Sequence, residues 1–225
     1  MDNTEFSNEF DILYNNIASN QAPGLDEYEK SVFLTIAQDA VVLDLYKGNS
    51  VDGKSFEETE ELRQYLSSIT KTHKAVPKED SEEPDIIKIF DKSCICDIPE
   101  DLWFITHESV KYEGKDFFDV EVFPVTQDTY TRISKNPFRK TTKNRVLRLN
   151  ISDKIELVSE YPIEYYVIRY ITKLEPIVLS DLPNGLSIKG MSEINECKLN
   201  PALHSTILLR AVELAKISMG LNGGK

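Results

Sequence analysis

Alternating side chains run through residues 161–179, YPIEYYVIRYITKLEPIVL. Alternate residues of an extended strand point to the same face of a sheet. Here these alternate positions are Tyr165, Val167, Arg169 and Ile171. Pro176 has no backbone N–H to give to a sheet, so it limits how much of the segment can lie centrally. The segment therefore predicts a long strand region.

The same period of two extends upstream to residue 86. Residues 101–114, DLWFITHESVKYEG, and 115–130, KDFFDVEVFPVTQDTY, alternate apolar with β-branched or aromatic residues, and KYEGKD predicts a turn between two strands. Residues 144–160, NRVLRLNISDKIELVSE, predict another hairpin with NISD near its tip. We therefore expect residues 86–199 to form an antiparallel β-rich region inserted into the fold.

Helical periods precede this region. Residues 4–19, TEFSNEFDILYNNIAS, predict a short amphipathic helix with Phe6, Phe10, Leu13 and Ile17 on one side. Asp26, followed three residues later by Glu29, predicts the capping box of a second helix. The helix is expected to end at Gly48. Its apolar stripe consists of Phe33, Ile36, Ala37, Ala40 and Leu43.

A third helix is expected from Ser55, with Glu58 as its capping partner, to about Ile69. Its apolar positions are Leu62, Leu66 and Ile69. Residues 71–85, KTHKAVPKEDSEEPD, are polar and contain two prolines, so they predict a linker or an exposed loop. Residues 1–85 thus form the expected N-terminal helical part.

The chain ends in another predicted helix. Asn200 is its expected N-cap and Pro201 occupies the first helical position, where a missing N–H costs nothing. The helix is expected to end at Gly220. It has two neighbouring apolar faces. One consists of Leu203, Ile207, Ala211, Leu214 and Ser218, and the other of Leu208, Val212, Ala215 and Met219. We expect residues 200–225 to pack back on the N-terminal helices. The fold class is α+β, a helical core with an inserted β region.

Composition limits the functions that this chain can have. No apolar run approaches the roughly 20 residues that cross a bilayer, and the first residues resemble no secretory signal, so we expect no membrane partner. Three cysteines and three scattered histidines offer no metal-ligand spacing, and free thiols are the expected state. No nucleophile motif or phosphate-binding loop is present, so we expect no catalytic, cofactor or metal site and no enzyme activity.

Positive charge gathers in one arm of an acidic chain. Residues 127–148 hold seven basic residues and one acid, while the whole chain carries 26 Lys+Arg against 38 Asp+Glu, a net charge of −12. The basic residues are Arg132, Lys135, Arg139, Lys140, Lys143, Arg145 and Arg148, and the acid is Asp128. The acidic balance argues against a general nucleic-acid binder but leaves room for a local contact through this arm.

Five segments resemble a known family. They are NEFDILYNNIASNQAPGLDEYEKSVFLTIAQDAVVLDLYKG (8–48), PEDLWFITHESV (99–110), VFPVTQDTYTRISKNPFRKTTKNRVLRL (122–149), YVIRYITKLEPIVL (166–179) and LNPALHSTILLRAVELAKISM (199–219). Together they resemble head–tail connector, or ring, proteins in the virions of crAss-like phages, which are similar to the portal adaptors of short-tailed phages. The first and third segments carry most of the resemblance.

The resemblance implies a structural role. About a dozen copies of such a protein would form a ring that joins the portal to the tail, at the head–tail junction of a virion assembled in the bacterial cytoplasm. The partners would be the chain itself, the portal protein and other tail or ring proteins, with packaged DNA passing through the channel without sequence-specific binding.

In such a ring we expect the arm to contact the neighbouring copy. The residues are Arg132, Lys135, Asn136, Pro137, Phe138, Arg139 and Lys140, with Phe138 as the apolar anchor. The arm could instead touch the portal, another ring protein or DNA, or remain a solvated loop. A second expected contact is the tail, which either docks on the portal or frays: Leu221, Asn222, Gly223, Gly224 and Lys225.

Two other classes of function stay open. The first is a nucleic-acid-binding factor that uses the arm 127–148 and its nearby aromatic residues, without a recognisable RNA-binding motif. The second is a small tail-associated hydrolase, which no group of residues favours.

Overall fold

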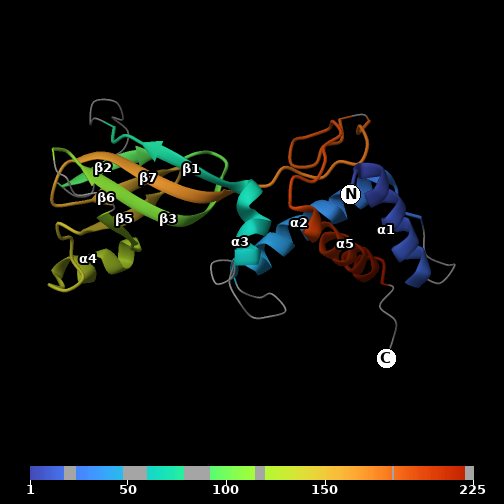
Figure 1. Cartoon of the computed structure of the whole chain (residues 1–225), viewed down its shortest axis with the longest axis horizontal. Coiled ribbons are helices and arrows are strands. Elements are labelled where there is room, and N and C mark those ends of the chain that lie inside the picture. Colours follow the sequence, from blue (N-terminus) through green and yellow to red (C-terminus); the bar gives the residue numbers. More distant parts are fainter. Residues whose placement is uncertain (18–23, 48–59, 79–91, 115–119, 184, 221–225) are drawn as a thin grey trace. The chain divides into compact units, whose positions relative to one another are not determined.

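The computed structural model describes residues 1–17, 24–47, 60–78, 92–114, 120–183 and 185–220. The chain divides into two compact units, which Figure 1 shows as ribbons. Met1–Ile69 and Leu174–Lys225 form a helical unit, and Thr70–Lys173 form a sheet unit. The protein is therefore α+β, and its chain crosses between the units twice.

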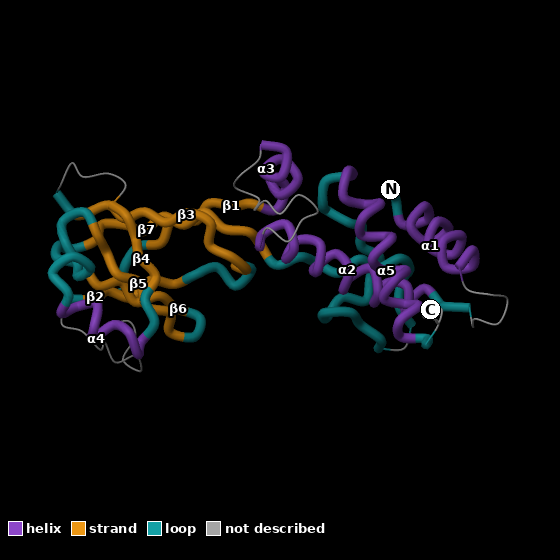
Figure 2. The backbone as a smooth tube through the Cα atoms, turned by 90° about the horizontal axis from the view of Figure 1, so that it is seen from below, coloured by secondary structure: helices purple, strands orange, loops and turns teal. Residues whose placement is uncertain are grey.

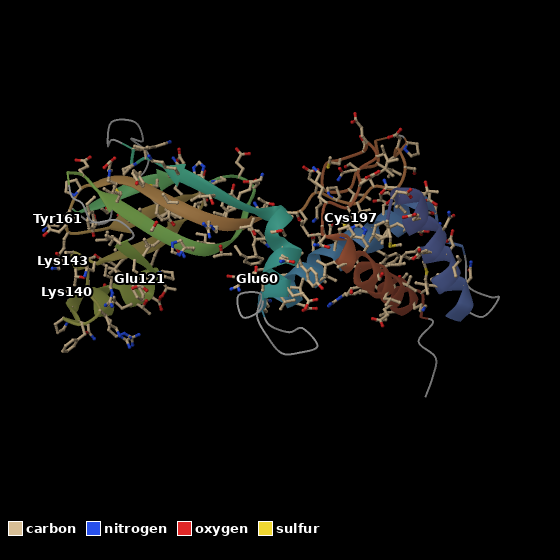
Figure 3. All side chains as sticks on the ribbon, in the orientation of Figure 1. Glu60, Glu121, Lys140, Lys143, Tyr161 and Cys197 are labelled. Carbon is tan, nitrogen blue, oxygen red and sulfur yellow. The ribbon has the colours of Figure 1, made fainter. Side chains whose placement is uncertain are left out.

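Helices α1 (Asn3–Ile17), α2 (Glu27–Lys47), α3 (Glu60–Leu66) and α5 (His204–Ser218) belong to the helical unit. Figure 3 labels Glu60, where α3 begins, and Cys197 in the segment before α5. Helix α5 packs against both α1 and α2. Its buried residues come from both of the predicted apolar faces: His204, Ile207, Leu208, Ala211, Val212 and Ala215.

The predicted starts before α2 and α5 and the predicted stop at Gly220 are present. The Asp26 carboxylate accepts from Glu29 N at 2.8 Å, and Glu29 Oε2 accepts from Asp26 N at 3.1 Å, which completes the capping box before α2. Asn200 Oδ1 accepts from Ala202 N at 3.0 Å before the short 3-10 turn Pro201–Leu203 that leads into α5. Gly220 follows α5 with φ +69°, a left-handed conformation that glycine adopts without strain. The stop predicted at Gly48 and the start predicted at Ser55, with its capping partner Glu58, lie outside the described residues.

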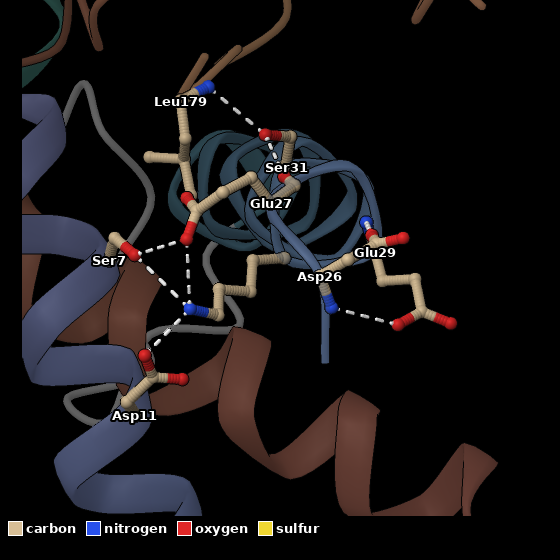
Figure 4. Close-up of polar contacts among 8 residues, drawn as sticks. Ser7, Asp11, Asp26, Glu27, Glu29, Ser31 and Leu179 are labelled. Carbon is tan, nitrogen blue, oxygen red and sulfur yellow. Dashed lines mark hydrogen bonds and ion pairs between the residues drawn. The ribbon is translucent and has the colours of Figure 1, made fainter. Parts of the chain in front are cut away.

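The apolar stripe predicted for α2 was wrong. Of the five expected residues only Ala37 is buried, and Ile36 is 49% exposed. The apolar residues that are buried are Leu34, Ala37, Val41, Val42 and Leu45. Beside them three polar side chains are buried, Ser31, Thr35 and Gln38, which bind the backbone of the irregular segment 175–179. Figure 4 shows one of these bonds, from Leu179 N to Ser31 Oγ at 3.0 Å. A segment outside any strand needs such partners because its buried N–H and C=O groups have no ladder of their own.

The sheet has seven strands in the order β1-β7-β3-β4-β5-β6-β2. Their bounds are β1 Thr70–Ala75, β2 Ser93–Asp97, β3 Leu102–Tyr112, β4 Val120–Pro124, β5 Arg145–Ile151, β6 Lys154–Val158 and β7 Ile163–Thr172. The expected hairpin is confirmed, because β5 pairs with β6 in antiparallel fashion. One expectation is corrected: β4 and β5 run parallel, so the sheet is mixed. Helix α4 (Gln127–Lys135) supplies the crossover that parallel neighbours require.

The sheet curls on itself. Figure 2 shows the strands bending round, and Lys78, beyond the end of β1, bridges to Ile95 in the strand at the opposite edge. Lys78 N donates to Ile95 O at 2.9 Å. The inner face is apolar and closely packed, with Val110, Tyr166 and Ile168 among its buried residues. In β7 the inward-facing residues are Tyr166 and Ile168, so Tyr165 and Val167, which the sequence pattern grouped together, lie on the opposite face of the strand.

Two further elements correct the sequence expectations. The segment expected to be a linker contains β1, which pairs with β7 from Thr70 to Ala75. Its charged composition suits an edge strand, where lysines discourage pairing with other chains. The strand expected to run to residue 130 ends at Pro124, and α4 follows because Tyr130 and Ile133, three residues apart, pack on one face.

Candidate assembly interface

The basic arm is held on the outer face of the sheet unit. Tyr130 and Ile133 of α4 pack against a small apolar cluster formed by Leu147, Leu149 and Val158 of β5 and β6. Helix α4 has no fully buried residue, so this contact is its anchor and its other face is open. The arm is therefore a short helix fixed at its base, followed by a turn.

The turn after α4 has a defined shape. Asn136 Oδ1 accepts from Phe138 N at 2.9 Å, and Asn136 O accepts from the backbone N–H groups of Arg139 and Lys140 at 3.1 and 2.9 Å. Arg145 Nη1 donates to Phe138 O at 2.6 Å from below. The ring of Phe138 is left 86% exposed at the tip of this ordered turn. A phenyl ring presented in this way is typical of an interface anchor.

The structure separates the seven cations into two groups. Five are exposed and make no ion pair with any other described residue: Arg132, Lys135, Arg139, Lys140 and Lys143. Figure 3 labels Lys140 and Lys143 beside α4. Arg145 lies over the Phe123 ring at 4.6 Å and supports the turn. Four of the cations expected at the interface, together with Lys143, are thus exposed on the arm, and the interface itself stays a prediction.

Arg148 does not belong to this surface. It points to the inner side of the sheet, where its Nε lies 3.0 Å from Glu108 Oε2, and the two side chains are 11% and 9% exposed. Tyr166 Oη donates to the same carboxylate oxygen at 2.7 Å. Burial raises the pKa of Glu108, while the Arg148 charge and the Tyr166 hydrogen bond act in the opposite direction. Arg148 is therefore a structural partner of a buried acid.

Charge is divided unevenly between the two units. The helical unit holds 9 basic and 19 acidic residues, a net charge of −10, whereas the sheet unit holds 17 and 19, a net charge of −2. Since the arm itself is positive, the chain offers a basic surface on one unit and a strongly acidic second unit.

Other kinds of site have less support within the described part of the chain. No group of three His, Cys, Asp or Glu residues is placed to hold a metal ion there, and no described helix is both long and apolar enough to cross a bilayer. Cys94 and Cys197 are half-buried and Cys96 is buried, all as free thiols, as expected. A cavity of about 660 Å³ opens beside Arg148, but lysines that line it are already paired, Lys154 with Asp97 and Lys173 with the Glu100 carbonyl.

Comparison with known proteins gives the class of this protein. The family model for phage tail ring protein 3/4 matches residues 1–225, so the chain belongs to that family. It is 45% identical over 225 residues to ring protein 3 of Bacteroides phage crAss001, covering 97% of this chain and 96% of the relative. It is 38% identical over 228 residues to ring protein 4/5 of the same phage, covering 96% and 92%. The chain is a structural ring protein of a phage tail.

Proposed function

We propose that this protein is a head–tail connector whose copies form a closed ring joining the portal to the tail. The observation that carries the proposal is the exposed arm, with five cations that have no ion pair among the described residues and a phenyl ring at its tip. The names of its two relatives, ring protein 3 and ring protein 4/5, support assembly into a ring. The resemblance to portal adaptors supports a place next to the portal and about a dozen copies.

The arm suits a ring because it differs from the surface that it would contact. A closed ring uses a head-to-tail interface, in which one surface of each copy meets a different surface of the next. Positive charge on the arm and negative charge on the helical unit would set the orientation and the rate of encounter. Phe138 would supply more of the affinity, because buried aromatic residues dominate interface energies.

Two features complete the proposal. Packaged DNA would pass through the ring without sequence-specific binding, since the arm offers a few surface cations on an acidic protein. The tail Leu221–Lys225 would dock on the portal; it lies outside the described residues, and this role follows from the resemblance.

Negative-stain imaging of the purified protein, alone and mixed with the portal protein from the same genome, tests the proposal. We expect a second ring layer on the portal in the mixed sample. A portal that stays bare, with a protein that forms no ring alone, would contradict the connector function.

A charge reversal tests the arm directly. We expect Arg139→Glu combined with Lys140→Glu to weaken ring formation at least tenfold, because two contacts would change from attraction to repulsion. Analytical ultracentrifugation and imaging with the portal measure this. The matched control is Lys47→Glu with Lys92→Glu, which changes net charge equally at exposed lysines outside the arm.

The same variants address the nucleic-acid alternative. Binding to duplex DNA with a salt slope near the number of arm cations, abolished by the reversal while rings persist, would favour the alternative. Rings that persist without any DNA binding would leave the arm as a solvated surface.

A further inference from the structure

Helix α5 has a groove on its outer side. Its volume is about 450 Å³, and it is lined by Thr206, Leu209, Arg210, Glu213, Leu214 and Ile217. Leu209 and Ile217 are 54% and 57% exposed, which is unusual for large aliphatic side chains on a helix whose opposite side is fully packed. The positions follow the helix at spacings of three and four, so they form one continuous strip.

The charges in this groove favour the binding of a positively charged group. Arg210 forms an ion pair with Asp44 of α2, so its positive charge is already compensated within the chain. Glu213 makes no ion pair within 4 Å of any described residue, although its charge acts on Lys216 of the same helix. The groove therefore offers two exposed aliphatic side chains and one carboxylate, on the unit whose net charge is −10.

The arm has the complementary features. Phe138 is 86% exposed, and Arg139 and Lys140 follow it immediately. We infer that Phe138 of one copy seats in the α5 groove of the neighbouring copy, with Lys140 or Arg139 opposite Glu213. This rests on the proposed ring, and it names the surface that receives the arm. An exposed apolar side chain that meets a pocket elsewhere on the same molecule makes the head-to-tail contact that rings use.

Zero-length carbodiimide cross-linking of intact virions tests this contact with natural residues. The reagent joins a lysine to a carboxylate only where the two groups touch. We expect a band of twice the chain mass in a denaturing gel, and within it a peptide pair that joins Lys140 or Lys135 to Glu213. Chains of two isotopic labels, produced by mixed infection, identify the link as one between copies.

The outcomes separate this inference from the proposed function. Links between copies that involve the arm but never α5 would overturn the groove and leave the ring intact. Links from the arm to a different virion protein would overturn the groove and move the arm to another partner. Complete absence of links between copies, with links inside the chain present, would contradict the ring as well.

Matched alanine variants provide an independent test. We expect Phe138→Ala and Leu209→Ala each to weaken self-association at least tenfold. The double variant should lose no more affinity than the single variant with the larger loss, because both substitutions remove the same contact. Ile12→Ala is the control, since Ile12 is 58% exposed on α1 outside the groove. Additive losses from the two variants would place Phe138 elsewhere.

Discussion

Replacing Arg148 with alanine should lower the free energy of unfolding by about 3–5 kcal/mol, the usual cost of leaving one partner of a buried ion pair alone. Arg148 and Glu108 are 11% and 9% exposed and lie 3.0 Å apart inside the curled sheet. Without the guanidinium, the Glu108 carboxylate keeps only the Tyr166 hydroxyl as a described hydrogen-bond donor. Urea unfolding of the purified protein measures the change.

The chain contains a matched control for this variant. Arg132 belongs to the same basic arm but is exposed on α4, so Arg132→Ala should change stability by less than about 0.5 kcal/mol. Equal losses from the two variants would mean that Arg148 acts only through the overall charge of the arm.

The loss at Arg148 should also depend on pH. The folded pKa of Glu108 is raised, chiefly by burial, so the stability linked to it is fully present below its unfolded pKa and declines as pH rises through the folded value. Since the Arg148 charge opposes this shift, its removal raises the pKa of Glu108 further. The deficit of Arg148→Ala should therefore be smaller near pH 5 than at pH 7.5. A pH-independent deficit would exclude Glu108 as its source.

Replacing Thr35 with valine should cost about 2–4 kcal/mol, because two buried backbone groups lose their partner at about 1–3 kcal/mol each. Thr35 Oγ1 accepts from Ile177 N at 3.1 Å and donates to Ile177 O at 3.3 Å. Both residues are buried, and valine keeps the shape of threonine without its hydroxyl. Chemical denaturation followed by circular dichroism at a helical wavelength reports the loss.

Thr72→Val is the comparison, because Thr72 is exposed on the edge strand β1 and should tolerate the change within about 0.5 kcal/mol. If Thr35→Val were as stable as this control, the Ile177 backbone would have found other partners.

The sequence predicted the elements that depend on local rules. The capping box at Asp26 and the cap at Asn200 are properties of a few neighbouring residues, and so is the hairpin between β5 and β6. The buried face of α2 could not be predicted in this way, because Ser31, Thr35 and Gln38 are buried only to serve a segment about 140 residues away in the chain. Polar side chains in that role resemble a solvent-facing stripe until the tertiary fold is known.

The arm shows the same division. Its charge excess was visible in the composition, whereas the turn that exposes Phe138 was not predicted, although Asn136 and Pro137 are residues that favour turns. The sequence could not separate Arg148 from the other cations, because its place depends on the register of β5 against neighbouring strands. A shift of one residue would turn Arg148 outward. The outer groove of α5 was missed: Leu209 and Ile217 lie off both apolar faces predicted for this helix, but two isolated aliphatic residues there do not indicate a groove.

Asp101 lies where the chain enters and leaves the sheet unit. Its carboxylate pairs with Lys71 at 2.8 Å and accepts from Tyr170 Oη at 3.0 Å, and its backbone carbonyl accepts from Lys173 N at 2.7 Å. Thr70 and Ile171 are directly opposed in the β1–β7 ladder, so the two crossings lie on the order of 5 Å apart at that point.

The sheet unit is thus an insertion whose first and last residues lie close together. A short turn in place of residues 70–173 would rejoin the helical unit without stretching it, since insertions are tolerated where chain ends already meet. Evolution can therefore replace or elaborate the sheet, and with it the arm, while the helices stay unchanged.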